Sequence, residues 1–488
     1  MQNGTAPPRP QAARAHLAAA ALRRHWLAAV LLAAGLVLRL LAQFAYRPVL
    51  FYIDTTRYLY NDAPGMDPVG YKGPLRAILA VANFNAVAAV QHLLGLAMAV
   101  LLYVLLLRRG SPRWLAALAM APLLLDAYQV QIEQTLMPDT WFEALVVAGL
   151  AILLWRPAPG WRAVVAGGVV LGTSAIFAQV GEALLLPAVI YLLAVGGGWR
   201  RALGRAAAVC AAFALPILAY STVNYLAAGD FFLSHTGVTS VYGRMAAAAD
   251  CTTLRLPQAE QKMCPARWQQ ALGPDFLDFG QLSPIRPYYS GLARDHVNSL
   301  ITDFNHRVLT QQPLRVLHAY LRDLVRPFAL TRDGSPGVTA ISRWQFQASY
   351  PYFAPHASRQ VIDSSADRFG GGRPAVWVPA ATFLRTYQLR GGYTPGPLFA
   401  LCVLAGLIGS ASLLVRRRAG PAAREPALAC LLMFASGVSV LLVSDVFEFS
   451  WRYLLPALVT LVPAGALGIG IMIRAAQARR AAGGAPGG

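Results

Sequence analysis

Acidic side chains gather in polar segments that follow long apolar runs of this sequence. Asp54 follows the first run, and Glu133 and Asp139 lie around a later one. If residues 139–155 are one helix, Asp139 and Glu143 share a face at i,i+4 spacing. Carboxylates that meet can deprotonate a hydroxyl or hold a divalent cation. We therefore take Asp54, Asp139 and Glu133 as candidate catalytic residues and Asp54 and Asp139 as candidate metal ligands. Asp139 has an alternative role as the N-cap of its helix.

Two cysteines, Cys251 and Cys264, lie in the longest polar region, whereas the other three lie in apolar runs. We expect a disulfide between Cys251 and Cys264, because the topology derived below places them in an oxidising compartment. A metal pair is the alternative, but no partner ligands lie at suitable spacing. The sequence has no CxxC, HExxH, Walker or GxGxxG motif, so zinc, P-loop and dinucleotide sites have no support.

The composition indicates that these residues belong to a membrane protein. The chain of 488 residues is 56% hydrophobic and 13% charged, whereas soluble domains have about 25% charged residues. A net charge of +20 alone would fit nucleic-acid binding, but the basic residues cluster in short segments between apolar runs. We therefore expect membrane lipids, and no nucleic acid, among the partners.

Ten apolar runs are candidates for membrane spans, since crossing the hydrocarbon core takes about 20 residues. The predicted spans are 26–45, 85–107, 114–130, 140–155, 162–179, 182–198, 204–227, 396–415, 427–445 and 453–473. The stretch 73–107 would be about 52 Å long as one helix, which exceeds the hydrocarbon core. We therefore predict a break near Asn83–Asn85 that separates an interfacial helix from the second span.

The basic residues predict the sidedness of the chain. With the N-terminus inside, nineteen basic residues fall in inner segments and five in short outer loops, which is a strong positive-inside bias. Both termini are therefore expected in the cytoplasm. The abundance of Arg, Ala, Gly and Pro favours a bacterial source, so we expect the bacterial cytoplasmic membrane. The first apolar stretch is too long for a signal-peptide core and is interpreted as an uncleaved anchor.

The expected fold class is an all-α polytopic membrane protein with about ten transmembrane helices and a mainly helical extracytoplasmic insert. The expected parts are a basic N-terminus (1–25), a bundle (26–227) with its first outer loop at 46–84, the insert (228–395), C-terminal transmembrane helices (396–475) and a disordered tail (476–488). Within the insert, 313–328 shows apolar residues at helical spacing. We expect this stripe to pack inside the insert; the alternative is a helix on the membrane interface.

Several stretches together resemble the GT-C superfamily of membrane glycosyltransferases, in the bacterial group that uses polyprenyl-phosphate sugars. They are YIDTTRYLY after the first span, P-x-GY at Pro68–Tyr71, QHLLGLAMAVLLYVLLLRRG at 91–110, LLLDAYQVQIEQTLMPDTWFEAL at 123–145 and SWRYLLP at 450–456. The likeness covers roughly residues 26–227 and 396–475. It departs from the family at Gln179 and Glu182, where many relatives carry an arginine.

The resemblance implies an enzyme that moves a hexosyl or pentosyl group, with inversion, from a polyprenyl-phosphate carrier to an acceptor hydroxyl of a cell-envelope glycan, lipid or protein. It maps the proposed base or metal contact onto Asp54 and a second acid onto Asp139, with Glu133 as the rival. A divalent cation is an optional cofactor. The departing lipid phosphate needs positive charge opposite it. The candidate substrate-binding residues are Tyr71, Lys72, Arg57, Arg76, His92 and Arg452.

Each of these candidates also has a structural interpretation. Arg57 and Arg76 fit surface or head-group contacts, and His92 fits a hydrogen-bonded core position. Arg39, in the first span, is expected to snorkel or to pair within the bundle. Two other functions compete with the glycosyltransferase: a lipid or polysaccharide flippase, which needs ionisable residues near the bilayer midplane, and a non-catalytic scaffold of envelope assembly.

Overall fold

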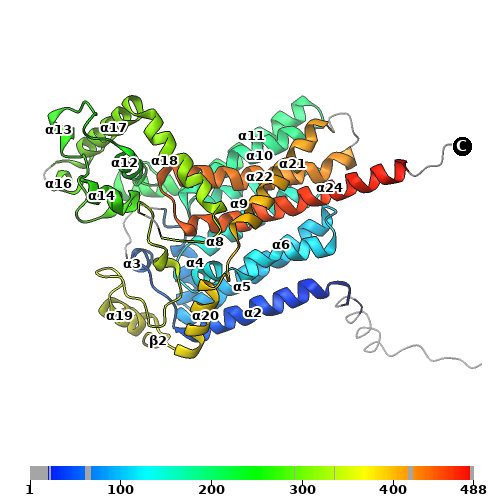
Figure 1. Ribbon diagram of the computed structural model, residues 1–488, viewed down its shortest axis with the longest axis horizontal. Helices are drawn as coiled ribbons and strands as arrows, with labels where there is room; N and C mark the ends of the chain where they lie inside the picture. The colour runs from blue at the N-terminus through cyan, green and yellow to red at the C-terminus, as the bar shows by residue number, and fades with distance from the viewer. Residues whose placement is uncertain are drawn as a thin grey trace, which may run out of the picture.

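The computed structural model describes residues 20, 23–60, 68–290, 292–334, 336–415 and 421–483. Long helices lie side by side along most of the molecule, and the shorter helices of residues 228–395 cap one end (Figure 1). We call the capped end the loop end. The opposite end, where the first long helix begins and the last one finishes, is the terminal end. The acidic residues Asp62 and Asp67 of the first polar segment lie outside the described residues.

Among the described residues, six helices are long and apolar enough to cross a membrane, or seven if a bent pair counts as one span. The six are α2 (Trp26–Ala45), α5 (Phe84–Arg108), α11 (Trp199–Ala228), α21 (Gly396–Val415), α22 (Pro421–Phe447) and α24 (Leu461–Gly483). The bent pair is α6 (Arg113–Leu125) with α7 (Ala127–Glu133), at 56°. The protein is therefore an all-α polytopic membrane protein, as its composition indicates.

The prediction of ten full-length spans differs from the structure, in which at most seven of the described segments are long and apolar enough to cross a membrane. The other three apolar runs form shorter helices: α8 (Asp139–Leu154), α9 (Trp161–Ala175) and α10 (Leu185–Val195), the last preceded by the 3₁₀ turn η1 (Gln179–Leu184). The longest of them, α8, has 16 residues, about 24 Å at 1.5 Å per residue, which is less than the hydrocarbon core. These helices pack against full-length neighbours, α8 on α5 and α9 on α11.

Small residues let the C-terminal helices approach closely. A Cβ added to Gly465 or Gly468 of α24 would collide with the backbone of Cys402 or Ala405 in α21. Such contacts replace the hydrophobic driving force that is absent between helices in lipid. The helix α24 continues to Gly483, so the prediction of disorder from residue 476 is wrong up to that point.

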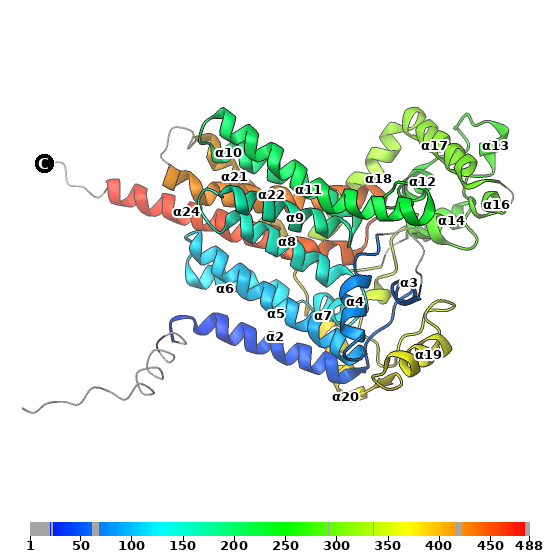
Figure 2. The same ribbon diagram turned by 180° about the vertical axis from the view of Figure 1, so that it is seen from behind.

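The predicted break in the long apolar stretch is confirmed. A short helix, α4 (Lys72–Leu79), ends before Asn83, whose side chain caps α5 by accepting a hydrogen bond from the backbone N–H of Asn85. Figure 2 shows α4 lying across the loop ends of α2 and α5 and not continuing α5. The preceding helix, α3 (Thr55–Tyr60), follows Asp54 directly.

The two halves of the insert belong to different hydrophobic cores. Its first half has its own core around Tyr242, Leu277 and Phe304, whereas residues of its second half, such as Trp344 and Leu384, join the core of the bundle. The first half comprises α12 (Gly237–Ala248), α13 (Gln258–Gln261), α14 (Arg267–Leu272), α15 (Pro274–Phe279), α16 (Arg286–Tyr289), α17 (Arg294–Gln311) and α18 (Pro313–Val325). The disulfide expected between Cys251 and Cys264 is present there.

The second half of the insert is built onto the end of the first span. Strand β1 (Tyr46–Arg47) pairs antiparallel with β2 (Ala375–Val376). Four further elements lie around this sheet or lead to it: η2 (Arg326–Phe328), η3 (Ile341–Trp344), α19 (Arg359–Phe369) and α20 (Val378–Leu389). Because η3 lies in the half of the insert that packs on the bundle, its residues lie at the loop end of the bundle.

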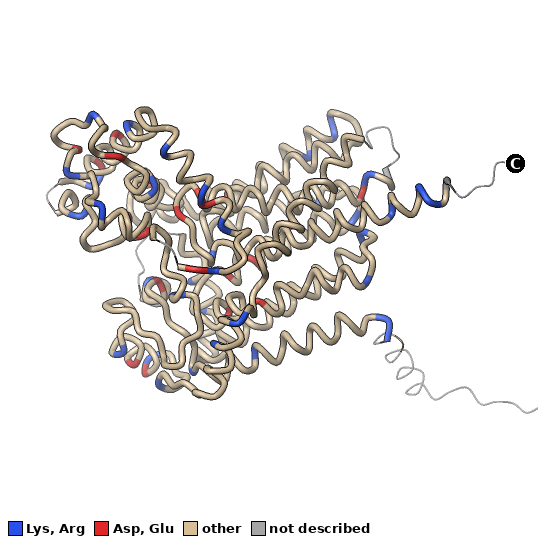
Figure 3. Tube along the Cα trace, in the orientation of Figure 1, with Lys and Arg blue, Asp and Glu red and all other residues tan. Residues whose placement is uncertain are grey.

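Charge is distributed unevenly between the two ends (Figure 3). Among described residues, the loops at the terminal end carry arginines such as Arg108, Arg156 and Arg200, whereas carboxylates concentrate at the loop end. One acid at the terminal end, Glu425, pairs with Arg109. The assignment of the terminal end to the cytoplasm stays a prediction from this pattern.

Candidate active site

Asp54 lies at the loop end because its segment is hydrogen-bonded to the loop between α7 and α8. The backbone N–H of Leu50 donates to Gln134 O at 2.9 Å, and that of Leu136 donates to Leu50 O at 2.9 Å. One turn later, the Thr55 hydroxyl donates to Leu136 O at 3.1 Å. The first and second polar segments are thus fixed to each other on either side of Asp54.

This pairing brings two of the candidate carboxylates together. Asp139 begins α8, and its Oδ1 lies 2.9 Å from Arg452 Nε, while Asp54 Oδ1 lies 3.0 Å from Arg57 Nη2. The Asp54 carboxylate interacts electrostatically with both Asp139 and Arg452. Side-chain exposures of 30% for Asp54 and 14% for Asp139 leave both within reach of a ligand. Asp139 is the first helical residue and not the N-cap, so the alternative capping role is wrong.

Arg452 comes from the last polar segment, which folds as η5 (Trp451–Leu454) and α23 (Leu455–Leu458) before α24 begins. Its guanidinium lies over the rings of Trp344 and Tyr453, 5.1 and 5.2 Å from their centroids. These ring contacts and the Asp139 carboxylate fix its orientation, since a guanidinium is attracted to aromatic faces. The cluster therefore combines three segments that are far apart in the chain.

The insert supplies one wall of this cluster. Arg343 Nη1 donates to the Tyr52 hydroxyl at 3.2 Å and to Asp275 Oδ2 at 3.0 Å. The ring of Tyr52 packs against Trp344 with centroids 4.7 Å apart. Burial raises the pKa of Tyr52 to about 12, so its hydroxyl stays protonated. Sequence reasoning missed Arg343, Trp344 and Asp275, because no motif in the insert connects them to the polar loops.

A further carboxyl, Glu448, lies close enough to Arg452 to interact with it electrostatically. Its oxygens accept hydrogen bonds from the Thr339 hydroxyl at 3.1 Å and the Tyr453 hydroxyl at 3.2 Å. Burial, with the nearby negative charge of Asp275 as a second cause, raises the pKa of Glu448 to about 8. At neutral pH this group is therefore largely uncharged, unlike an ordinary carboxylate.

Glu133, the rival of Asp139, lies outside this cluster. Its Oε1 is 2.7 Å from Arg39 Nη2 and its Oε2 is 3.0 Å from His92 Nδ1. Both Arg39 and Glu133 are almost completely buried, and the second ring nitrogen of His92 bonds to Gln134. Glu133 and His92 therefore belong to a buried hydrogen-bonded group, whereas Asp139 lies in the partly exposed cluster.

Arg39 stabilises the bend between α6 and α7. Its guanidinium donates to the backbone oxygens of Leu123 and Leu124, which lie in the last turn of α6. Such terminal carbonyls need a partner when they are buried. A Cβ at Gly95 would collide with Glu133, so this position of α5 has to stay small.

The remaining candidates belong to α3 and to the start of α4. Tyr71 is fully buried, and its hydroxyl donates to Gln91 Oε1 at 2.8 Å. Lys72 is 8% exposed at the start of α4, and Arg76 is exposed one turn later on the same helix. Burial makes Tyr71 a poor substrate contact in this conformation, whereas Arg57 lies directly on Asp54.

A second buried ion pair anchors the insert. Arg332 Nη2 lies 2.8 Å from Asp126 Oδ2, and both side chains are nearly inaccessible. The guanidinium contacts the rings of Tyr128 and Trp451, 4.6 and 5.6 Å from their centroids. Because Trp451 precedes Arg452, this anchor also fixes the segment that carries Arg452.

The sequence leads us to expect an optional divalent cation at Asp54 and Asp139. Asp139 Oδ2 is buried and has no hydrogen-bond partner among described residues. Within the described part of the chain, no group of three or more His, Cys, Asp or Glu side chains has metal-binding geometry. Asp54 and Asp139 are thus the protein ligands on which a cation would depend, and its requirement stays a prediction.

No protein-family model matches the chain, and no curated protein matches it. Two solved structures show a loose likeness. One, from the Saccharomyces cerevisiae protein O-mannosyltransferase Pmt1–Pmt2 complex bound to the sugar donor, has 17% identity over 46% of this chain, with a TM-score of 0.33. The other is the oligosaccharyltransferase AglB of Archaeoglobus fulgidus in complex with an inhibitory peptide and a dolichol-phosphate. It has 14% identity over 96% of this chain, with a TM-score of 0.37.

Both matched proteins belong to the GT-C superfamily that the sequence resembles. The chain spans only 36% and 52% of the two matched chains. With TM-scores below 0.5, the likeness carries no argument about the site, so any functional conclusion depends on the geometry described above.

Proposed function

We propose that this protein transfers a sugar from a polyprenyl-phosphate carrier to a hydroxyl of a cell-envelope acceptor, at the extracytoplasmic face of a bacterial membrane. The observation that carries the proposal is the meeting of Asp54 and Asp139 with Arg57 and Arg452 at the loop end of the bundle. A partly exposed carboxylate beside positive groups suits a reaction that removes a proton and releases an anion.

In the proposed reaction, the acceptor oxygen forms a bond to the anomeric carbon of the donor. The bond between that carbon and the phosphate oxygen breaks, and its electron pair leaves with the lipid phosphate. Asp54 takes the hydroxyl proton, and its contact with Arg57 orients the carboxylate for this role. A single displacement of this kind inverts the anomeric centre.

The departing phosphate needs positive charge that is already in place. Arg343 directly precedes Trp344 in the chain, the Arg452 guanidinium lies 5.1 Å from the ring centroid of Trp344, and both arginines are partly exposed. A divalent cation bound by Asp54 and Asp139 would add charge for the same phosphate. The protein contribution in either case is orientation. Two rings and Asp139 fix the Arg452 guanidinium, and Asp275 and the Tyr52 hydroxyl fix that of Arg343.

Location supports a lipid-linked donor. Nucleotide sugars are made in the cytoplasm, whereas the positive-inside pattern assigns the cluster to the opposite face. A donor that stays in the membrane can reach the cluster at the loop ends of the spans. The short helix α4, which contains Lys72 and Arg76, lies across these ends (Figure 2).

The test is label transfer by the purified full chain. Radiolabelled polyprenyl-phosphate sugars are incubated with the protein and native membrane extract, and label in the acceptor fraction is measured. The variant Asp54→Asn should lose transfer. The matched control is Asp363→Asn, which also removes a partly exposed carboxylate that pairs with an arginine, Arg359, one turn away. Transfer by the control and not by Asp54→Asn supports the proposal.

Two outcomes would overturn the proposed function. Absence of transfer by the wild-type protein with every donor tested would favour the scaffold. Intact label that crosses sealed vesicles would favour the flippase.

A further inference from the structure

Helix α18 exposes a continuous apolar stripe, contrary to the expectation that its apolar residues pack inside the insert. The exposed fractions are 77% for Leu314, 49% for Leu317, 49% for Leu321 and 61% for Val325. The steps of three, four and four residues put these side chains on one face of the helix. Four large apolar side chains in a row on a fixed helix need a partner surface.

The opposite face of α18 is already bound to the protein. Asp323 is fully buried and accepts a hydrogen bond from Arg244 Nη1 at 2.5 Å. The Tyr320 hydroxyl donates to the backbone oxygen of Leu442 in α22 at 2.9 Å, and Val316 is buried against the first core of the insert. The helix cannot roll to hide its leucines without breaking these contacts.

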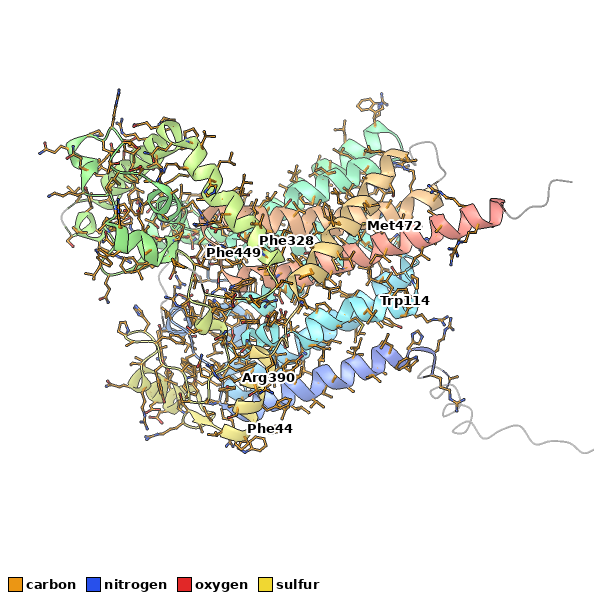
Figure 4. The ribbon with its side chains drawn as sticks, in the orientation of Figure 1. Phe44, Trp114, Phe328, Arg390, Phe449 and Met472 are labelled. Carbon is orange, nitrogen blue, oxygen red and sulfur yellow. A yellow bond between two sulfur atoms is a disulfide. The ribbon has the colours of Figure 1, made fainter. Side chains whose placement is uncertain are left out.

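The stripe continues onto the lipid-facing surface of the bundle. After α18, Phe328 stacks on Phe399 of α21 with ring centroids 5.8 Å apart. Leu398 and Leu401, on the first turns of α21, are 45% and 53% exposed. Figure 1 shows α18 descending to the loop ends of α21 and α22, and Figure 4 shows Phe328 at this junction. An apolar surface that faces lipid on α21 thus extends along α18.

Basic side chains border the stripe. Arg315 and Arg322 are seven residues apart and therefore lie on the same side of the helix, and their side chains are 56% and 49% exposed. A helix with an apolar face and a basic flank is typical of helices that lie in the membrane interface. Phosphate head groups, and anionic lipids in particular, complement such a flank.

We propose that the leucine stripe of α18 (Leu314, Leu317, Leu321 and Val325) is inserted into the membrane leaflet at the loop end, with Arg315 and Arg322 among the head groups. The insert is then attached to lipid at a second place, besides the spans from which it emerges. This inference does not depend on the proposed reaction, because it concerns a surface outside the Asp54 cluster.

Lipid attachment of α18 would also support the segment that carries Arg452. Arg244 binds Asp323 of α18 and donates to the backbone oxygen of Asp445 at 2.9 Å. The Arg326 guanidinium lies 5.7 Å from the ring centroid of Phe449. Two contacts thus connect the helix to residues just before η5.

The experiment measures the lipid contact directly. Leu317→Cys and Leu321→Cys are labelled with a bimane fluorophore in the full chain and reconstituted into vesicles of phosphatidylcholine and phosphatidylglycerol. Quenching by a lipid with a doxyl group near its head group is then recorded. The matched control is Leu272→Cys at the end of α14, which is also 49% exposed but lies outside α18 and its apolar stripe.

The proposal expects quenching at least about twofold stronger for the α18 probes than for the Leu272 probe, with blue-shifted emission that indicates a dry environment. Equal quenching at all three positions would overturn it. Disulfide cross-linking between two copies of the Leu317→Cys chain, with no lipid quenching, would also overturn it and would assign the stripe to a protein interface.

Discussion

Two groups of charged residues at the loop end have the same chemistry and opposite surroundings. In one, Asp54 pairs with Arg57 and Asp139 with Arg452, and all four side chains keep 14–30% exposure. In the other, Glu133 pairs with Arg39 at 2.7 Å with 0% and 1% exposure. Asp139 and Glu133 are six residues apart, and yet one lies in the exposed group and the other in the buried group.

In this protein, burial and not residue type distinguishes charged residues of the candidate site from charged residues that stabilise the fold. The buried group stabilises the bend between α6 and α7. It also fixes the loop between α7 and α8, to which the segment that carries Asp54 is hydrogen-bonded at Leu50. Asp139 of the exposed group directly follows that loop, and its other members, Asp54, Arg57 and Arg452, come from two other segments and remain accessible to a ligand. The following predictions test this division in order of decreasing effect.

Removal of the buried charge should affect folding most strongly. Glu133→Gln leaves the Arg39 guanidinium buried without a counter-charge, which should cost about 3–5 kcal/mol of stability. The measurement is the midpoint of thermal unfolding in detergent, followed by loss of monodisperse protein. A variant that melts at the wild-type temperature but lacks transfer would place Glu133 in the reaction and break the comparison.

Removal of an exposed charge should instead affect the reaction. Arg452→Gln should lower the rate of sugar transfer about 10²–10³-fold, because positive charge near the departing phosphate is lost. The unfolding midpoint is measured in parallel. Arg359→Gln is the control, since it removes an arginine from the surface pair with Asp363. A rate close to that of the control would exclude a role for Arg452 in the reaction.

Protonation of Glu448 should give a pH dependence of stability. Its pKa in the folded protein, about 8, is higher than its ordinary value of 4.5. The folded state therefore holds a proton that the unfolded state releases, so stability should fall as pH rises from about 5 through 8. Unfolding midpoints across this range test the slope, and Glu448→Gln should flatten it. The same slope in the variant would assign the effect to other groups.

The smallest effect is expected at Tyr71, which the sequence grouped with substrate-binding residues. Tyr71→Phe removes one buried hydrogen bond to Gln91 and should cost about 1 kcal/mol of stability. The KM for the donor should stay unchanged, because the Tyr71 hydroxyl is buried and bonded to Gln91. A clear rise in KM with unchanged stability would return Tyr71 to the substrate contacts.

The loops between apolar runs could be predicted from the sequence, but the meeting of the side chains in the cluster could not. Each run ends in a polar segment, which puts Asp54, Asp139 and Arg452 at one end of any bundle with this sidedness. The capping side chain of Asn83 also marked the break before α5. The sequence could not decide whether Asp139 or Glu133 is the acid near Asp54. Glu133 ends α7, and the bend between α6 and α7 that sets its position is created by tertiary packing.

The insert was the least predictable region. Its residues Arg343 and Trp344 reach the cluster because the second half of the insert packs on the bundle and pairs β2 with β1. Two-residue strands and short 3₁₀ turns have no periodic pattern from which such packing can be derived. The apolar stripe of α18 shows the converse case, because its helical spacing was clear while the direction that it faces depends on Asp323 and Tyr320 on the other side.

The central claim is that the exposed group performs the reaction and the buried group holds its loop in place. Its most direct test is the single-turnover rate of sugar transfer by Asp54→Asn and Glu133→Gln, measured on the monodisperse fraction of each protein. We predict a loss of about 10²–10⁴-fold for Asp54→Asn with an unchanged unfolding midpoint, and a nearly wild-type rate for the folded fraction of Glu133→Gln. A folded Asp54→Asn protein that transfers sugar at the wild-type rate would contradict the account.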